Sequence, residues 1–336
     1  MQYRTLGQSG IEISAVGFGA WAIGGWMWGG ADEGQAVAAI QAAIDNGITL
    51  IDTAPMYGYG RSEEIVGQAI HGRRDRVVLA TKCGLRWDCE EGEFFFRADD
   101  KGLTSADTGK NIYKLLRPDS ICRELEDSLR RLKTDHVDLY QTHWQESTTP
   151  IQDTAAALEK LKQQGKIRAF GVSNASLAQI QAYGPIDSDQ ERFSMLDRGA
   201  ESDGMLDYCR QHEIAMLAYS PLANGLLTGK IAPDRRFGAG DLRNNNPRFQ
   251  PQNIRSVNAM LATFQPIAER HRSSLAQLAI AWTFSQPGLS CVLCGARDAV
   301  QAAENAAAGD IRLSADELAI MDQAARSLIA APGFGQ

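Results

Sequence analysis

The strongest constraint on the fold is a repeated alternation of short apolar runs with helical patterns along the 336 residues. Short apolar runs are typical of strands buried in a parallel sheet, and helical patterns between them indicate strand–helix–strand units. The eight predicted strands are AVGFGA, ITLIDTA, RVVLATK, HVDLYQTH, IRAFGVSN, RFSML, AMLAYSP and SCVLCGAR. Eight such units without an intervening linker predict an α/β fold, a (β/α)8 TIM barrel formed by residues 1–336 as one domain.

Smaller elements are expected at both ends of this barrel. A glycine-punctuated β-hairpin is predicted over about 2–14. An extra helix is predicted at the C-terminus, where Ser314 and Glu317 have the spacing of a capping box. Ser62 is expected to cap the helix that follows the second strand.

A doubly wound sheet is the main alternative fold. It would need a strong GxGxxG fingerprint that follows the first strand and opens a helix. Residues 17–22, GFGAWA, approximate that fingerprint, but they continue into IGGWMWGG, which cannot open a helix. The barrel is therefore favoured.

Composition narrows the functional class. The formal net charge is −7 and no Lys/Arg block stands out, which argues against nucleic-acid binding. No apolar run reaches the length of about 18 residues that a membrane span needs, and the N-terminus lacks a signal-peptide pattern. The six cysteines are scattered, which predicts reduced thiols in a cytoplasmic protein. Cys291 and Cys294 form a C-x-x-C, which we interpret as buried strand thiols and not a redox or metal site.

Polar residues follow the predicted strands at the end where barrels carry their chemistry. The strand ends carry Asp52 and Tyr57, Lys82, His143, Ser173 and Asn174, Tyr219, and the segment Gly295–Arg297. Each alone could be a solvated or capping residue. Four ionisable groups from three neighbouring strands (Asp52, Tyr57, Lys82 and His143) together indicate a functional site.

Asp, Tyr, Lys and His together can donate a proton to a carbonyl. A free tyrosine is a poor acid at pH 7, and we expect the ammonium of Lys82 to bring the pKa of Tyr57 down. Asp52 would hold Lys82 in place, and His143 would orient the carbonyl oxygen. The set contains no metal ligand cluster and no activated nucleophile. These side chains cannot supply a hydride, which has to come from a cofactor.

The segment after the eighth strand is a candidate phosphate site. GAR leads into a helix N-terminus, and barrels often bind phosphate after strands seven and eight. Arg297, Gln301 and Asn305 are spaced to share one helix face. Arg297 could bind a ribose 2′-phosphate, which would favour NADP(H), or it could only solvate the helix start.

These motifs together resemble the aldo-keto reductase family. The resemblance covers nearly the whole chain and is carried by GFGAWAIGG, LIDTAPMYGYGRSEE, VVLATK, DLYQTHW, IRAFGVSN, AYSPLANGLLTGK and GARDAVQAAEN. It implies an NADP(H)-dependent carbonyl reductase in which Asp52, Tyr57, Lys82 and His143 are the catalytic tetrad. The chain is similar in particular to a bacterial branch of this family that includes glyceraldehyde, general-stress and inositol-linked reductases.

The resemblance also implies where the cofactor binds. The implied residues along the cofactor are Gly19, Ala20, Trp21, Ser173, Asn174, Gln190, Tyr219, Ser220, Leu222, Gly225, Lys230, Gly295, Arg297, Gln301, Glu304 and Asn305. Gln190 would hold the nicotinamide carboxamide with Ser173 and Asn174, and Tyr219 would stack on the ring. Two departures from the family pattern are Phe193, where relatives often have tyrosine, and the alanine-rich helix after Arg297. A third is the long acidic insertion DCEEGEFFFRADDKGLTSADTGKN, which is expected to cover part of the substrate pocket.

The substrate is expected to be a small carbonyl compound bound by aromatic walls. Trp21, Trp28, Trp87 and Trp144 lie on expected loops at this face and are candidate substrate-binding residues. Long loops at about 84–116 and 222–253 are expected at the same face. The sequence carries no signal for an oligomeric state.

Two other functions remain open at this stage. Barrels of this kind can serve as cofactor-binding regulatory modules for a partner, such as a channel β-subunit. Lys82 at a strand end could alternatively form the Schiff base of an aldolase. The intact tetrad favours the reductase.

Overall fold

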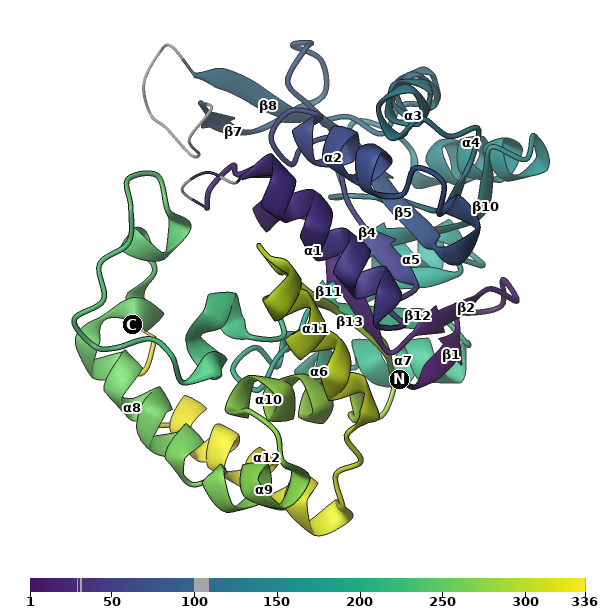
Figure 1. Ribbon diagram of the computed structural model, residues 1–336. Coiled ribbons are helices and arrows are strands. Elements are labelled where there is room, and N and C mark those ends of the chain that lie inside the picture. The colour runs from purple at the N-terminus through teal and green to yellow at the C-terminus, as the bar shows by residue number, and fades with distance from the viewer. Residues whose placement is uncertain (29, 31, 100–108, 336) are drawn as a thin grey trace.

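The computed structural model describes residues 1–28, 30, 32–99 and 109–335. Eight parallel strands close into a barrel, with helices outside it (Figure 1). In order around the barrel the strands are β10 (Ile167–Ser173), β11 (Ser188–Arg192), β12 (Ala215–Tyr219), β13 (Leu289–Cys294), β3 (Val16–Gly19), β4 (Leu50–Asp52), β5 (Val78–Cys83) and β9 (Val137–Thr142). The predicted (β/α)8 barrel is confirmed.

Helices follow the strands and cover the outside of the barrel. In Figure 1, α1 and α11 lie side by side, and the two helices are in contact. The α-helices are α1 (Glu33–Asp45), α2 (Arg61–Ala69), α3 (Pro118–Leu132), α4 (Ile151–Gln163), α5 (Leu177–Tyr183), α6 (Gly199–Ser202), α7 (Met205–Gln211), α8 (Pro251–Ala262), α9 (Gln265–His271), α10 (Leu275–Phe284), α11 (Ala299–Ala307) and α12 (Ala315–Ile329). The short 3-10 helices are η1 (Ala22–Gly24), η2 (Arg74–Arg76), η3 (Ala223–Thr228), η4 (Leu242–Asn245), η5 (Pro247–Phe249) and η6 (Ala308–Asp310).

One of the two predicted helix starts is confirmed and the other is wrong. Ser314 and Glu317 form the capping box of α12. Ser62 does not cap α2, because the cap residue is Gly60 and Ser62 lies inside the helix. The hydroxyl of Ser62 is buried and instead donates to the carbonyl oxygen of Ala20 at 2.9 Å. Ser62 thereby links α2 to the turn after β3.

An N-terminal hairpin closes one end of the barrel. Strands β1 (Tyr3–Thr5) and β2 (Glu12–Ser14) pair antiparallel, as predicted. The apolar side chains of Leu6 and Ile13 are fully buried. They belong to one cluster with Leu50 and Val78, the first residues of β4 and β5. The hairpin therefore covers the N-terminal ends of the strands, and the carboxyl ends are left for a site.

The sixth barrel strand is not the predicted RFSML but the segment before it, SDQER. Ser188, Asp189 and Gln190 in this strand are all buried. The apolar Phe193 follows the strand and packs against Trp282, with ring centroids 6.2 Å apart. Apolar periodicity cannot identify a strand whose buried side chains are polar. The predicted strand was therefore the nearest apolar run, RFSML.

The first insertion, expected as a long loop, contains a small antiparallel sheet in the order β6 (Leu85–Arg86), β8 (Lys110–Lys114), β7 (Glu93–Ala98). Trp26, Met56 and Ile112 are buried in the cluster that packs with this sheet. Residues 100–108 of the insertion lie outside the described residues. In Figure 1, β7 and β8 lie on the opposite side of the molecule from α8 and α9.

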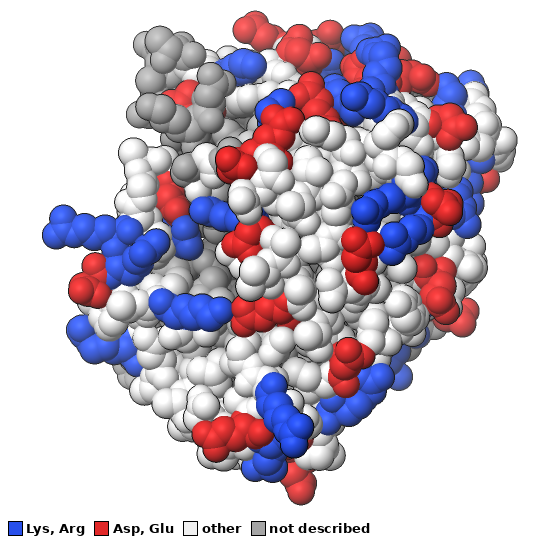
Figure 2. Space-filling view, in the orientation of Figure 1, with Lys and Arg blue, Asp and Glu red and all other residues white. Residues whose placement is uncertain are grey.

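The surface carries mixed charge. Figure 2 shows acidic and basic side chains interspersed on the face in view. In the part of the chain that the structure describes, the helices are all too short or too polar to cross a membrane.

Candidate active site

Lys82 and Asp52 form a buried ion pair between neighbouring strands. Asp52 ends β4 and Lys82 lies near the end of β5, and these strands pair in the barrel. The Lys82 Nζ donates to both carboxylate oxygens of Asp52 at 2.7 Å and to the carbonyl oxygen of Thr53 at 3.0 Å. Lys82 is 0% exposed and Asp52 is 3% exposed. Three acceptors around one nitrogen satisfy the three N–H groups of an ammonium.

Tyr57 and His143 lie beside this pair. Tyr57 is in the turn after β4, and His143 directly follows β9. Their rings meet edge to face, with centroids 5.5 Å apart. The Lys82 Nζ lies 5.2 Å from the centroid of the Tyr57 ring. The four residues predicted from three strand ends are thus together at the carboxyl end of the barrel.

Burial dominates the electrostatics of the tetrad. It raises the pKa of Tyr57 well above its usual value, and the charge of Asp52 adds to this rise. Burial and the nearby charge of Lys82 hold the pKa of His143 well below its usual value. Burial also lowers the pKa of Lys82, while Asp52 acts in the opposite direction. Tyr57 therefore keeps its proton at pH 7, and His143 is neutral.

The expected lowering of the Tyr57 pKa by Lys82 is wrong for this structure. Asp52 neutralises Lys82 at 2.7 Å, so the pair as a whole offers Tyr57 little positive charge. Removing the phenol from water penalises the phenolate and raises the pKa of Tyr57.

The residues implied for the nicotinamide form a hydrogen-bonded group next to the tetrad. The Gln190 side-chain amide donates to Asp52 at 3.0 Å. The Ser173 hydroxyl donates to the backbone oxygen of Gln190 at 2.8 Å. The Asn174 amide donates to the backbone oxygen of His143 at 3.0 Å, and the Tyr219 hydroxyl donates to the Asn174 Oδ1 at 2.8 Å. Tertiary contacts therefore join β10, β11 and β12 at this point.

The turn after β3 lies next to the tetrad as well. Gly19 pairs with Asp52 in the barrel register, and the Ala20 N–H donates to the backbone oxygen of Asp52 at 2.8 Å. The Trp21 ring lies 6.2 Å from the Tyr57 ring between centroids. Trp28 meets Trp21 edge to face at 5.3 Å. Trp21 and Trp28 thus form one wall beside Tyr57.

Trp87 and Trp144 belong to a second aromatic group. Trp87 contacts Tyr59 at 5.5 Å, and Trp144 contacts Phe95 at 5.1 Å, both between ring centroids. Both tryptophans pack against the buried cluster associated with the small sheet. The sequence placed the insertion at this face but did not single out Phe95 or Tyr59, since no local signal shows which of its aromatic side chains pack together.

The residues implied for the phosphates lie on the segment after β12 and on α11. Ser220 and Gly225 have left-handed backbone, with φ of 57° and 93°. Lys230 contacts Glu304 of α11, with Nζ 3.2 Å from the carboxylate. At the start of α11 the Arg297 N–H donates to Gln301, and the Asn305 amide donates to the backbone oxygen of Gly295. Leu222 caps η3 in the same segment.

Arg297 lies beside a second arginine that the sequence did not identify. Its guanidinium donates to the backbone oxygen of Trp28 at 2.7 Å. The positive charge of Arg243 contributes to lowering the pKa of Arg297, after burial. Arg243 pairs with Asp241 at 2.6 Å, and its Nη1 lies 3.9 Å from the position of a β-carbon added to Gly225. Arg243 was missed because it lies in the second insertion, where no periodicity or turn signal distinguishes one arginine from another.

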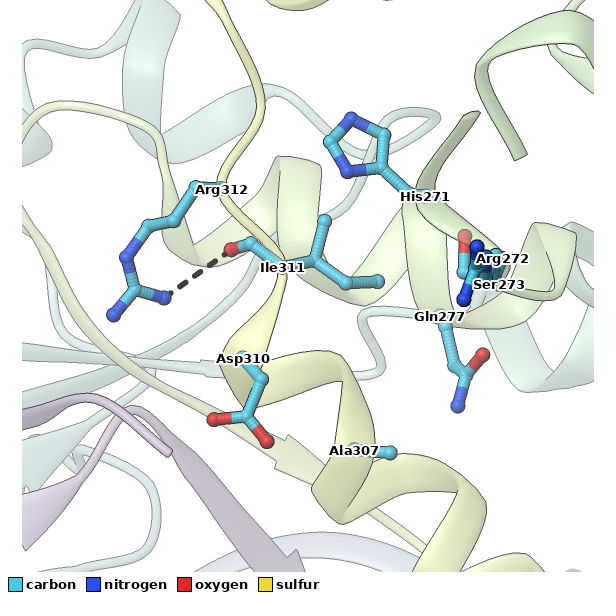
Figure 3. A pocket seen from close by; sticks show the side chains of 8 residues that line it. All are labelled: His271, Arg272, Ser273, Gln277, Ala307, Asp310, Ile311 and Arg312. Atoms are coloured by element: carbon cyan, nitrogen blue, oxygen red, sulfur yellow. Dashed lines mark hydrogen bonds between the residues drawn. The ribbon is translucent and has the colours of Figure 1, made fainter. Parts of the chain in front are cut away.

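A separate pocket of about 370 Å³ lies away from the tetrad, between α9, α10 and the end of α11 (Figure 3). It is lined by His271, Arg272, Ser273, Gln277, Ala307, Asp310, Ile311 and Arg312. His271 is already paired with Glu317, and Asp310 with the N-terminal amine. In Figure 3 the guanidinium of Arg312 points away from Arg272 and Ser273. We therefore do not assign the chemistry to this pocket.

Among the described residues no cluster of three or more His, Cys, Asp or Glu side chains could hold a metal ion. All six cysteines are free, and Cys291 and Cys294 are buried in β13, as the sequence predicts.

Comparisons with known proteins agree on one family. Residues 15–326 match the model of the aldo/keto reductase family. The NADH-specific methylglyoxal reductase of Escherichia coli is 41% identical over 98% of this chain and 99% of that protein. The aldo-keto reductase YhdN of Bacillus subtilis is 40% identical over 88% of this chain and 85% of that protein.

Solved structures give the same result. The glycerol dehydrogenase AKR11B4 of Gluconobacter oxydans matches with a TM-score of 0.85 and 38% identity, over 98% of this chain and 96% of that one. An aldo/keto reductase of Klebsiella pneumoniae in complex with NADP and acetate matches with a TM-score of 0.68 and 32% identity, over 99% and 97%.

Proposed function

The chain belongs to the aldo/keto reductase family, and from that premise we propose that it catalyses the reversible NADPH-dependent reduction of a small aldehyde or ketone. Tyr57 is the proposed proton donor. The observation that carries the proposal is the buried Lys82–Asp52 pair, which lies against Tyr57 and His143 at the carboxyl end of the barrel.

Tyr57, His143 and Lys82 have different proposed roles around the substrate oxygen. Tyr57 holds its proton until negative charge develops on that oxygen. An alkoxide is more basic than a phenolate, so the proton transfer remains favourable although the pKa of Tyr57 is raised. Neutral His143 can donate a hydrogen bond to the same oxygen and fix its position. The phenolate left on Tyr57 then lies close to the ammonium of Lys82.

The phosphate end fits a nicotinamide dinucleotide. The bound cofactor would supply the hydride. Three cations lie at this end, Lys230, Arg243 and Arg297. Lys230 pairs with Glu304 and Arg243 with Asp241, whereas the Arg297 guanidinium donates to a backbone oxygen that a phosphate could replace. Gly225 lacks a β-carbon and leaves room for a close approach by a phosphate group. The nicotinamide would be held by Ser173, Asn174, Gln190 and Tyr219, with Gly19, Ala20 and Trp21 beside its ring. The rest of the dinucleotide would be held by Ser220, Leu222, Gln301 and Asn305.

Cofactor choice is proposed to favour NADP(H). The support is the second guanidinium, Arg243, next to Arg297, because a ribose 2′-phosphate adds charge at the adenosine end. The K. pneumoniae relative was solved with NADP, whereas the E. coli relative is named NADH-specific. Titration of the protein with NADPH and NADH in parallel tests this choice, and tighter NADH binding would contradict it.

The aldolase alternative conflicts with the state of Lys82. A Schiff base requires a neutral amine that can reach the substrate carbonyl. The Lys82 nitrogen already contacts three acceptor oxygens and is inaccessible to solvent. Borohydride treatment with an aldehyde substrate should therefore leave no adduct on Lys82, and a trapped adduct would support the aldolase.

A turnover assay separates the reductase from a regulatory module. We expect oxidation of NADPH with at least one compound among glyceraldehyde, methylglyoxal, aromatic aldehydes and aldoses. Tight cofactor binding without turnover of any of them would favour a regulatory role. We also propose a cytoplasmic location, supported by the six unpaired cysteines.

A further inference from the structure

Strand β11 carries two carboxyl groups that the proposed reaction does not use, Asp189 and Glu191. Between them, Gln190 points into the barrel and donates to Asp52. Because side chains alternate along a strand, Asp189 and Glu191 face the helix layer. Asp189 is 0% exposed, and both of its carboxyl oxygens are buried without a hydrogen-bond donor among the described residues.

A proton shared with Glu191 would give Asp189 a hydrogen-bond partner. Two carboxylates are both acceptors, so one of them has to be protonated to donate to the other. Burial raises the pKa of Glu191 to about 7. Burial and the charge of Glu191 raise the pKa of Asp189 well above its usual value. The pair therefore holds at least one proton near neutral pH and releases it to solvent as pH rises.

The groups around the pair do not compensate a second negative charge. From α7 the pair faces Cys209, whose pKa is raised by burial and by both carboxyls, so this thiol stays neutral. On β12 the residues in register with the pair are Met216 and Ala218, which are apolar and buried. Arg192 of β11 has the orientation of Gln190 and so lies on the opposite face of the strand from the pair, with its guanidinium carbon 5.8 Å from the Tyr219 ring centroid. From the turn after β10 the contact is the backbone N–H of Ala175, 2.9 Å from the Glu191 Oε1.

That N–H connects the pair to the proposed nicotinamide site. Ala175 follows Asn174, which has an unusual left-handed backbone with φ of 54°. The Asn174 side chain spans the site, since it donates to the backbone oxygen of His143 and accepts from the Tyr219 hydroxyl. The Glu191 carboxylate thus fixes the turn that orients Asn174.

We propose that Asp189 and Glu191 share a proton and act as a positioning pair for the Asn174 turn, so that loss of this proton weakens cofactor binding. The inference rests on the cofactor placement proposed above. The buried carboxylate of Asp189 and the half-buried carboxylate of Glu191 would repel each other, and a displacement of Glu191 by this repulsion would lengthen its hydrogen bond from the Ala175 N–H. We expect a loss of affinity of about 3- to 10-fold, the factor given by one typical hydrogen bond.

The test compares the dissociation constants of NADPH and NADH from pH 6 to pH 9, followed by quenching of tryptophan fluorescence. In Asp189→Asn the side-chain amide donates permanently to Glu191, so this variant should bind with wild-type affinity at pH 6 and show a flatter profile. Glu191→Gln keeps the acceptor for the Ala175 N–H and should flatten the profile too. Titration of the cofactor itself is common to all variants and cancels.

Glu124→Gln is the matched control. Glu124 is another buried carboxyl with a pKa raised to about 8 by burial, but it accepts from the backbone of Gly84 on the β5 side of the barrel. Its profile should follow the wild type. Superimposable profiles of wild type, Asp189→Asn and Glu191→Gln would overturn the inference. The infrared band of a protonated carboxyl, present at pH 7 in the wild type and reduced in Asp189→Asn, tests the shared proton without cofactor. Failure to bind NADPH or NADH at every pH would instead contradict the proposed function.

Discussion

At the tetrad end of the proposed site, Lys82 and Asp52 lie on paired strands and are 0% and 3% exposed. At the phosphate end, Lys230 and Glu304 lie on a loop segment and a helix, and the Lys230 side chain is 67% exposed. The Lys82–Asp52 pair of the tetrad is held by hydrogen bonds between two neighbouring strands, whereas the phosphate end uses contacts that a ligand could replace. Arg297, for example, donates to the backbone oxygen of Trp28, and a phosphate oxygen could take the place of that acceptor.

The two ends differ in how precisely their side chains have to be positioned. Proton transfer requires donor and acceptor to be fixed within fractions of an ångström, and the buried pair on two neighbouring strands gives the turn that carries Tyr57 a rigid neighbour. Phosphate binding depends on net positive charge and tolerates movement of long side chains. We therefore expect substitutions at the tetrad end to lower rate and stability, and substitutions at the phosphate end to change affinity by smaller factors.

Tyr57→Phe should have the largest effect. The ring and its packing against Trp21 and His143 remain, but the proposed proton donor is lost. General acid catalysis is typically worth about 10² to 10⁴ in rate, and we expect the upper end. Turnover and NADPH binding should be measured together, and binding should persist. Loss of both would make Tyr57 structural, and retained turnover would transfer the acid role to His143.

Lys82→Met should lower the maximal rate by orders of magnitude and also destabilise the fold. Asp52 would be left as a buried charge without its partner, which typically costs about 3 to 5 kcal/mol. Denaturant unfolding measures this loss. The double variant Asp52→Asn, Lys82→Met removes the orphaned charge and should recover part of the stability but none of the rate. Additive losses in unfolding free energy would argue against a coupled pair.

Arg297→Ala should weaken NADPH binding by about 1.5 to 3 kcal/mol, the range of a charged hydrogen bond, while NADH binding barely changes. Fluorescence titration with the two cofactors gives this difference directly. The contact between Arg297 and Trp28 offers a different outcome. If Arg297 acts only by holding the Trp28 segment, both cofactors should lose affinity equally, and the proposed reading of the 2′-phosphate would be wrong.

Lys230→Gln should have the smallest effect. Exposed ion pairs contribute about 0 to 1 kcal/mol, so unfolding free energy should change by less than this amount. NADPH affinity should fall by less than in Arg297→Ala, and the fall should shrink as salt is added. A loss as large as that of Lys82→Met would remove the contrast between the two ends.

The sequence by itself determined the barrel and the position of its chemistry. Alternating apolar runs and helical patterns are local signals of burial, and seven of the eight predicted strands coincide with observed ones. The carboxyl ends of parallel strands meet at one face, so Asp52, Tyr57, Lys82 and His143 could be placed together from their positions along the chain.

Only the tertiary structure decided properties that depend on distant partners. Strand β11 has polar buried residues whose partners lie on other strands, so its position could not be predicted from apolar periodicity. The pKa of Tyr57 rises because of burial and the charge of Asp52, which the sequence alone cannot weigh against Lys82. Arg243 and Arg297 come together although 54 positions separate them. Desolvation and charge depend on all atoms within a few ångströms, and the folded chain alone sets which atoms those are.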